Sequence, residues 1–286
     1  STNRKKFLDL KPKKIIVGDF LDKELVSKIL KKNKVNIVFH LGAITQVLDS
    51  LKDPYKTHQI NILGTINFLE SIRRINPKIV FIYSSSDKAY GELNKRRFYR
   101  ESDRLQSDYP YDVSKSASDL VCQSYSKTFN LKVGIIRCGN IYGPGDFNLK
   151  RLIPEVIIST IKNKRFIIRS DGKSTRDYVY VNDVVDAYVL LMKKLLISKS
   201  MLRIYNVSSK FNYSVKQIVN MILKNMDSFN LRPIVKNYSK KEINFQRLNY
   251  SKIERELKWR PKTKIEQGII ETIRWYKKYY KFLKIK

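Results

Sequence analysis

Short apolar runs and amphipathic stretches alternate through the first half of the chain. Four runs rich in β-branched residues predict strands: Lys14–Val17, Val35–Leu41, Ile79–Tyr83 and Leu131–Arg137. Three stretches with apolar residues at helical spacing predict helices: Leu21–Lys32, Ile60–Ile75 and Tyr111–Phe129. Strands that are almost continuously apolar and that alternate with helices are typical of a parallel sheet covered on both faces. The first half therefore predicts a doubly wound α/β fold.

The spacing of apolar residues changes after Gly145, and helical patterns dominate the rest of the chain. The predicted elements are one short strand, Arg165–Ile168, and four helices, Leu152–Ile161, Val181–Leu195, Val215–Met226 and Ile265–Tyr276. We therefore expect two portions: residues 1–145, which hold the parallel sheet, and residues 146–286, which form a smaller α+β arrangement.

The chain is strongly basic: its 286 residues include 58 lysines and arginines against 26 acidic residues, a formal net charge of +32. Such a charge fits a protein that binds nucleic acid or an anionic membrane surface. It also fits a compositional bias, because the lysines are scattered through every segment and do not form one block. We favour the second interpretation and expect no nucleic-acid partner. A basic protein still attracts anions such as a diphosphate.

Cysteine and histidine are scarce, with two of each in the chain. Cys122 and Cys138 form neither a disulfide framework nor a metal-binding motif, so we expect a metal-free protein in a reducing compartment, the cytoplasm. No apolar run approaches the ~20 residues that a membrane-spanning helix needs. We therefore expect no transmembrane segment.

Small and polar residues follow the predicted strands of the first half. They are Gly18-Asp19, His40–Ala43, Ser84–Asp87 and Cys138–Asn140. Ligands of open parallel sheets bind at the carboxyl ends of the strands, where these residues would meet. The sequence therefore predicts a ligand site at that edge of the sheet.

Tyr111 and Lys115 are four residues apart, so they share one face of the predicted helix. A phenol has a pKa near 10, and a neighbouring ammonium lowers that pKa because it favours the phenolate. The pair could then take a proton from a sugar hydroxyl while a hydride leaves. A surface tyrosine stacked on a lysine stem has the same spacing, but the three serines Ser84–Ser86 upstream favour an active site.

Six ordered motifs across nearly the whole chain resemble the extended short-chain dehydrogenase/reductase superfamily, the NAD-dependent epimerases and dehydratases. They are GDFLD (Gly18–Asp22), HLGA (His40–Ala43), SSSDKAYG (Ser84–Gly91), YDVSK (Tyr111–Lys115), RCGNIYGPGD (Arg137–Asp146) and TRDYVYVNDV (Thr175–Val184). The resemblance implies a Rossmann-like sheet, NAD as cofactor, a nucleotide-diphosphate sugar as substrate, and a homodimer formed through a helix bundle that includes Tyr111–Phe129. It also implies that residues 1–145 bind NAD and that residues 146–286 mainly bind the substrate.

The resemblance also implies a role for single residues. Ser86, Tyr111 and Lys115 match the catalytic set; Asp19, Phe20, Leu41, Gly42, Ala43 and Ser84, together with Tyr111 and Lys115, match cofactor contacts; Asn140 and Arg176 match substrate contacts. Asp19 would reach the adenine, and Arg176 would meet the diphosphate or ribose of the substrate. Other interpretations stay open, since Asp19 could be a turn residue, Asn140 a strand-end cap and Arg176 a surface ion pair.

The pair Asp87-Lys88 distinguishes two chemistries within the superfamily. Simple sugar epimerases usually have small or apolar residues after the hydroxyls, whereas dehydratases have an acid there that helps to expel water from carbon six. Asp87-Lys88, Tyr99–Leu120 and Gly145–Pro154 resemble the CDP-glucose 4,6-dehydratase branch. The ending Ala89–Gly91 is that of an epimerase, and Lys88 would have to act as a base or as a charge stabiliser where glutamate is commoner.

The glycine-rich G-x-x-G-x-x-G turn that cradles the pyrophosphate in this superfamily is absent from the sequence. By the resemblance, Lys14–Val17 corresponds to the third strand, so we expect an N-terminal truncation of a longer protein by about 40 residues, the size of one strand–helix–strand unit. A degenerate relative that binds NAD weakly is the alternative. The leading hypothesis is a 4,6-dehydratase; a 4-epimerase and a non-catalytic basic binding protein are the rivals.

Overall fold

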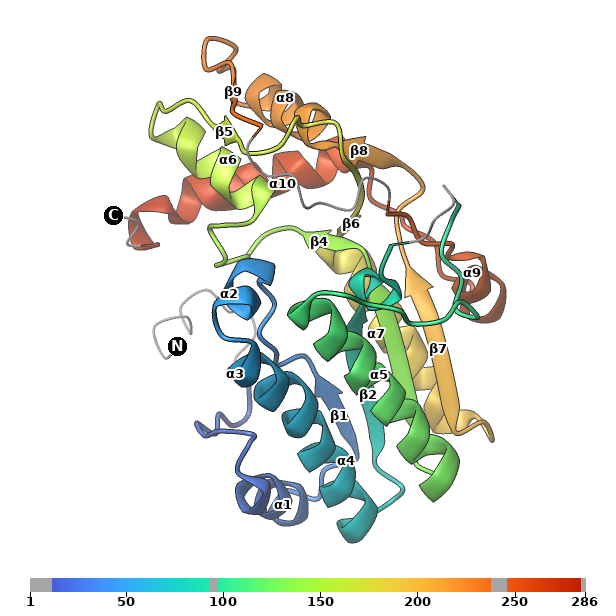
Figure 1. Cartoon of the computed structure of the whole chain (residues 1–286). Coiled ribbons are helices and arrows are strands. Elements are labelled where there is room, and N and C mark those ends of the chain that lie inside the picture. Colours follow the sequence, from blue (N-terminus) through green and yellow to red (C-terminus); the bar gives the residue numbers. More distant parts are fainter. Residues whose placement is uncertain (1–11, 93–96, 238–245, 284–286) are drawn as a thin grey trace.

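The computed structural model describes residues 12–92, 97–237 and 246–283. Its centre is a four-stranded sheet in which β1 (Ile37–His40), β2 (Val80–Ser86), β3 (Val133–Cys138) and β7 (Leu202–Val207) lie in that order. All neighbouring strands run parallel, so their carboxyl ends meet at one edge (Figure 1). The predicted α/β class with a parallel, Rossmann-like sheet is confirmed.

Helices cover both faces of this sheet. One face packs on α1 (Lys23–Lys32), α4 (Gly64–Ile75) and α5 (Pro110–Phe129), and the other packs on α7 (Val181–Ile197). Successive side chains of a strand point to opposite faces. Accordingly Phe81 and Tyr83 of β2 lie in the core beneath α4 and α5, while Val80 and Ile82 lie in the core beneath α7.

The prediction of a strand at Lys14–Val17 was wrong. These residues form no strand among the described parts of the chain, and β1 pairs only with β2. Val17 is 79% exposed, and Ile15 and Ile16 are also exposed. An apolar run becomes a strand only when a neighbouring strand accepts its backbone hydrogen bonds, and the described residues provide no such neighbour for it.

The predicted helices of the first half are present with shifted ends, and the helix expected at Ile60–Ile75 begins as a π-helical turn, η2 (Gln59–Leu63), that continues into α4. Two short helices before it, α2 (Val47–Lys52) and α3 (Pro54–His58), were not predicted. Asp53 caps α3 by accepting a hydrogen bond from the backbone N–H of Lys56, and Pro54 occupies the first helical position. This cap and proline are the helix-start signal that sequence analysis could have used.

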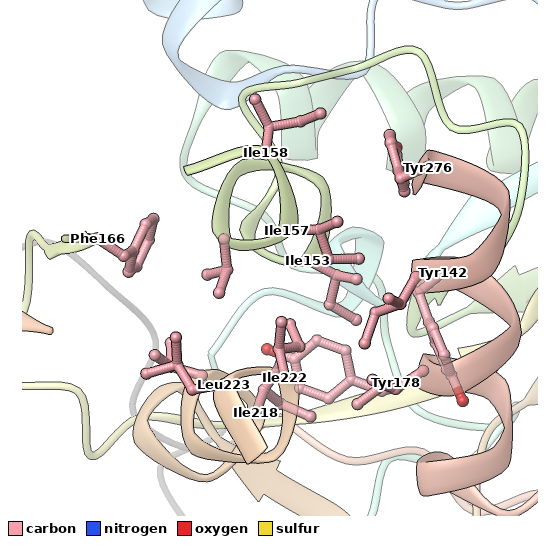
Figure 2. Packing of buried hydrophobic residues seen from close by; sticks show 14 of the residues in the cluster. Tyr142, Ile153, Ile157, Ile158, Phe166, Tyr178, Ile218, Ile222, Leu223 and Tyr276 are labelled. Atoms are coloured by element: carbon pink, nitrogen blue, oxygen red, sulfur yellow. The ribbon is translucent and has the colours of Figure 1, made fainter. Parts of the chain in front are cut away.

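The second half builds a core of its own beyond the carboxyl ends of the parallel strands (Figure 1). Helices α6 (Leu152–Ile161), α8 (Val215–Asn225) and α10 (Ile265–Tyr279) enclose it, as predicted, beside a small sheet of β4 (Asn140–Tyr142), β6 (Thr175–Tyr180) and β8 (Asn212–Ser214). Figure 2 shows the side chains of Ile157 on α6, Ile222 on α8 and Tyr276 on α10 gathered in this core.

Three smaller elements are the paired strands β5 (Ile167–Ile168) and β9 (Ile234–Val235), and the helix α9 (Ser251–Leu257). The expected strand at Arg165–Ile168 corresponds to β5. Strand β7 comes from the second half of the sequence, yet it pairs with β3 in the main sheet. The division of the chain at residue 145 stays a prediction.

Candidate active site

Polar side chains gather at the carboxyl end of β2. The strand continues past the predicted end at Tyr83 through all three serines, and the 3-10 helix η3 (Asp87–Tyr90) begins directly after it. The Ser86 hydroxyl donates to Asp87 Oδ1 at 3.0 Å and accepts from the backbone N–H of Lys88 at 3.2 Å. Ser86 and Asp87 are both buried. The serine therefore fixes the first turn of η3 and the carboxyl group that it carries.

Helix α5 brings the other two predicted catalytic residues to the same place. Its first helical position is Pro110, whose fixed φ favours a helix start, so Tyr111 lies in the first turn and Lys115 one turn later. The Lys115 ammonium donates to the backbone carbonyl of Ser84 at 2.5 Å and lies 4.8 Å from the centre of the Tyr83 ring. The hydroxyls of Tyr111 and Ser86 are within hydrogen-bonding reach. The structure thus brings Ser86, Tyr111 and Lys115 together.

The protonation of this pair differs from the expectation that Lys115 lowers the pKa of Tyr111. Burial raises the pKa of Tyr111 to about 12, and only the hydrogen bond from Ser86 and the charge of Arg151 act in the opposite direction. Burial also lowers the pKa of Lys115 to about 8. The expectation considered only the charge of the neighbour and not the desolvation of the phenolate, which is the larger effect here.

Asp87 has the environment of a proton donor. Its side chain is buried, and this burial raises the pKa of its carboxyl group. Lys88, Ser86 and Arg176 favour the charged form but do not outweigh burial. A carboxyl group with a raised pKa keeps its proton closer to neutral pH and can give it to a leaving group.

The predicted cofactor contacts lie around the ends of β1 and β2. Leu41 is 60% exposed, Gly42 is exposed and Ala43 is half-buried. Asp19 is exposed and accepts a hydrogen bond from the backbone N–H of Leu21 at 2.9 Å, as a turn residue does. Phe20 packs edge-on against His40, with 5.6 Å between ring centres.

The predicted substrate contacts lie on the small sheet. Asn140 is exposed at the start of β4, and Arg176 is on the adjacent strand β6. The positive charge of Arg176 favours the charged form of Asp87, so the arginine is near the buried acid. The individual roles of these residues stay predictions.

Sequence analysis missed Asn61, which lies buried in the π-helical turn η2. Its side-chain oxygen accepts from the backbone N–H of Ile44 at 2.8 Å, and its amide nitrogen donates to the Ile44 carbonyl at 3.0 Å and to the Ser114 hydroxyl at 2.8 Å. Asn61 therefore joins the loop after β1 to the helix that carries Tyr111 and Lys115. An asparagine between two isoleucines on a predicted helix was the available signal.

A family model described as GDP-mannose 4,6 dehydratase matches residues 2–272. The chain belongs to this family.

A dTDP-D-glucose 4,6-dehydratase from Dictyostelium discoideum is 32% identical over 308 residues, which cover 92% of this chain and 69% of that protein. Among solved structures, a dTDP-glucose 4,6-dehydratase from Streptomyces venezuelae with NAD and TYD bound has a TM-score of 0.86 at 25% identity, covering 97% of this chain and 84% of its own. A UDP-glucose 4-epimerase from Thermotoga maritima with UDP-glucose has a TM-score of 0.85 at 26% identity, covering 92% and 84%.

These relationships confirm the resemblance to the NAD-dependent epimerases and dehydratases. The finer resemblance to the CDP-glucose branch stays a prediction, because the relatives named above are described with dTDP-glucose or UDP-glucose. The chain therefore belongs to a family of enzymes. The catalytic roles of Ser86, Asp87, Tyr111 and Lys115 stay predictions.

Residues 12–92, 97–237 and 246–283 contain no cluster of histidine, cysteine, aspartate and glutamate side chains that could hold a metal ion. None of their helices combines the length and the apolar character needed to cross a bilayer. Cys122 and Cys138 are both buried as free thiols.

His40 gives the fold of this family member a pH dependence. The imidazole is 4% exposed, is hydrogen-bonded to the Thr65 hydroxyl at 3.1 Å, and packs against the rings of Phe68 and Phe81. Burial, with a smaller contribution from the charge of Lys115, lowers its pKa from 6.5 to about 4. The native state therefore binds this proton less readily than the unfolded state.

The contribution of His40 to the free energy of unfolding is fully present above pH 6.5 and is lost as the pH falls towards 4. Over this range the imidazole is protonated in the unfolded chain but stays neutral in the native state. We expect the difference in free energy of unfolding between the wild type and His40→Phe to shift by up to about 3 kcal/mol between pH 7 and pH 4. Urea titrations of both proteins at several pH values measure this difference. A difference that does not change with pH would contradict the assignment.

Proposed function

We propose that the protein is an NAD-dependent nucleotide-sugar 4,6-dehydratase, which removes water from the sugar through a 4-keto intermediate. The observation that carries the proposal is the buried Asp87 beside Ser86, Tyr111 and Lys115. The tyrosine, serine and lysine suffice for oxidation at carbon four. A protonated acid next to them is required only when a hydroxyl must leave as water.

The residues at the strand ends suit NAD. Tyr111 and Lys115 supply a hydroxyl and an ammonium, Leu41 exposes apolar surface at the end of β1, and Asp19 is exposed after the segment 14–17. In this proposal Tyr111 and Lys115 contact the nicotinamide side of the cofactor, and Leu41 and Asp19 contact the adenine side. The described residues include no glycine-rich turn that would bind the pyrophosphate. NAD, when bound, supplies the hydride acceptor for carbon four and the hydride donor for carbon six.

Tyr111 takes the proton of the 4-hydroxyl in this proposal. Burial alone works against the phenolate, so the tyrosine needs the Ser86 hydrogen bond and a nearby positive charge to reach a working pKa. Arg151 contributes one such charge, and Lys115 is fixed by its bond to the Ser84 carbonyl. The resulting ketone at carbon four acidifies the hydrogen on carbon five.

Asp87 gives its proton to the departing 6-hydroxyl, which leaves as water. The bond between carbon six and oxygen breaks as the hydrogen on carbon five is removed, so a double bond forms between carbons five and six. Arg176 and Asn140 hold the nucleotide diphosphate, since a guanidinium binds phosphate oxygens in a bidentate way. The overall positive charge of the chain attracts this substrate.

Product analysis tests the proposal. The full-length protein, incubated with NAD and dTDP-glucose, UDP-glucose, CDP-glucose or GDP-mannose, is expected to convert at least one of them to a 4-keto-6-deoxy sugar, which NMR identifies. Asp87→Asn should abolish this product while oxidation at carbon four remains visible as NADH absorbance. Full turnover by Asp87→Asn would make Asp87 a structural residue.

A 4-epimerase is the second candidate. The similarity to the Thermotoga maritima epimerase and the sequence Ala89–Gly91 after the Asp87-Lys88 pair favour it. An epimerase shares Ser86, Tyr111 and Lys115 but needs no acid at position 87. Inversion at carbon four without loss of water would establish it. Salt-sensitive RNA or vesicle binding with no NAD affinity would instead support a basic binding protein.

We also propose that the protein is a cytoplasmic homodimer. Helices α2, α3 and α5 pack on one another. Their exposed apolar side chains are Leu48, Leu51, Tyr55 and Leu120. A second copy would remove this surface from water. Light scattering after size exclusion should give twice the chain mass, and Leu120→Lys should give the single mass. A wild type that is monomeric at micromolar concentration would contradict the proposed homodimer.

A further inference from the structure

Asp177 is a buried carboxylate for which sequence analysis gave no role. It follows Arg176 on β6, and successive side chains of a strand point to opposite faces. Asp177 is 1% exposed, and a Cβ at Gly139, directly after β3, would lie only 2.6 Å from its own Cβ. Burial raises the pKa of Asp177 to about 7. A carboxylate is therefore costly at this position, and its presence calls for a specific explanation.

The carboxylate of Asp177 ties β6 to the segment 246–249. Its oxygen Oδ2 accepts from the backbone N–H of Leu248 at 2.8 Å, and Oδ1 accepts from the Ser209 hydroxyl at 3.4 Å. Leu248 is itself 2% exposed. The shorter bond, to a buried backbone group, therefore fixes where the segment 246–249 lies relative to β6.

Tyr99 continues this tie to η3. Tyr99 and Leu248 form a parallel β-bridge. The Tyr99 N–H donates to the Arg247 carbonyl, and the Tyr99 carbonyl accepts from the Asn249 N–H, both at 2.8 Å. The Tyr99 side chain is 1% exposed, and its hydroxyl donates to the Gly91 carbonyl at 2.8 Å. Gly91 is the C-cap residue of η3, so Tyr99 holds the end of the turn that begins with the proposed proton donor.

These hydrogen bonds form one path between two proposed functional groups. The path runs from β6 through Asp177, the segment 246–249 and Tyr99 to η3. It joins the strand of Arg176, the proposed phosphate contact, to the turn of Asp87, the proposed acid. Elimination depends on the separation of these two groups, since a displacement of about 1 Å can lower a rate by about 10²-fold. Oxidation at carbon four uses the tyrosine and lysine of α5, which lie outside the path.

We propose that Asp177 is a positioning residue for elimination: through its tie to Tyr99 it holds the acid Asp87 at the hydroxyl on carbon six. This proposal rests on the dehydratase function proposed above. The tie matters because Arg176 fixes the other end of the substrate. Without the carboxylate of Asp177 the acid and the phosphate contact shift relative to each other. The sugar is then oxidised at carbon four but loses water slowly, so NADH accumulates.

The test compares oxidation at carbon four with formation of the product. The full-length protein is given NAD and a nucleotide sugar that the wild type converts. Asp177→Ala is expected to lower the formation of the 4-keto-6-deoxy product by about 10²-fold. The rate at which NADH appears in a single turnover should stay near the wild-type value, and the NADH should persist longer. Asp177→Asn keeps an oxygen that can accept from the Leu248 N–H and should restore most of the product formation.

A double-variant comparison tests whether Asp177 and Tyr99 act along one path. Tyr99→Phe removes the hydrogen bond to Gly91 and should lower product formation by about tenfold, the effect of one such bond. The double variant Asp177→Ala/Tyr99→Phe should be no slower than Asp177→Ala alone. Independent effects would instead multiply to about 10³-fold. Tyr99→Phe keeps the buried ring, so it tests the tie even if Asp177→Ala does not fold.

Asp183→Ala is the matched control. Asp183 is a buried carboxylate on α7 that accepts from the backbone N–H of Thr263 at 3.0 Å. Its alanine variant should lose stability yet keep the wild-type ratio of NADH appearance to product formation. Equal losses of NADH appearance and product in Asp177→Ala, multiplied effects in the double variant, or a wild-type ratio in Tyr99→Phe would overturn the role of Asp177 and leave the dehydratase function standing. A wild type that oxidises carbon four but never eliminates water would overturn both.

Discussion

Replacing Tyr111 by phenylalanine is expected to lower the turnover of the full-length protein by about 10²–10⁴-fold, the usual contribution of general acid–base catalysis. The substitution removes only the hydroxyl that is within reach of Ser86, so the buried ring and the helix start are kept. Substrate binding should change little, because the proposed phosphate contacts, Asn140 and Arg176, are on the small sheet. Steady-state kinetics and a binding titration separate the two effects.

Tyr109→Phe is the matched control for this prediction. Tyr109 lies two residues earlier, at the N-cap position of α5, and makes no side-chain cap hydrogen bond. Its phenylalanine variant should retain wild-type turnover. If Tyr111→Phe kept more than a tenth of the wild-type rate, the base at carbon four would have to be another group.

The apolar pattern predicted the layers of the fold but not how far each strand extends. The expected strand at Ile79–Tyr83 ends where apolar residues end, yet β2 runs on to Ser86, because Ser84 to Ser86 still pair with Ile136 to Cys138 of β3. Backbone pairing depends on a neighbouring strand and not on side-chain polarity. Lys14–Val17 is the reverse case, an apolar run without a described partner.

The candidate site could be located from the sequence, but its electrostatics could not. Spacing alone places Tyr111 and Lys115 on one helix face, and the structure agrees. The direction of the pKa shift of Tyr111 depends on burial, which requires the whole fold. Asn61 was missed for a related reason, since its partner Ser114 lies 53 residues away. Long-range contacts of this kind leave no periodic signal along the chain.

Loss of the carboxylate of Asp119 is expected to have the largest effect on stability. Nε and Nη2 of Arg137 on β3 each donate to this carboxylate on α5 at 2.9 Å, and the two side chains are 2% and 0% exposed. Arg137 also donates to the Tyr90 hydroxyl at 2.9 Å, which in turn donates to Asn206 at 2.7 Å. The network therefore joins α5 and η3, the two elements that hold Tyr111 and Asp87.

Asp119→Ala should lower the free energy of unfolding by about 3–5 kcal/mol, because it leaves the Arg137 guanidinium buried without a counter-charge. Urea unfolding followed by circular dichroism measures the loss. The control is the exposed pair in which Lys262 donates to Asp186 at 2.7 Å. Asp186→Ala should cost only about 0–1 kcal/mol, since water screens that pair.

The double variant Asp119→Leu/Arg137→Met separates two causes of the stability loss in Asp119→Ala: the unpaired buried charge of Arg137, and the absence of the ion pair itself. Two apolar side chains of similar size leave no buried charge, so stability should recover towards the wild-type value even though the ion pair is gone. Tyr90 would still lose its donor, and η3 would be held less firmly against α5. We therefore expect the double variant to fold but to turn over substrate more slowly than the wild type. Equal instability of the single and the double variant would mean that the pair itself, and not an unpaired charge, supports the fold.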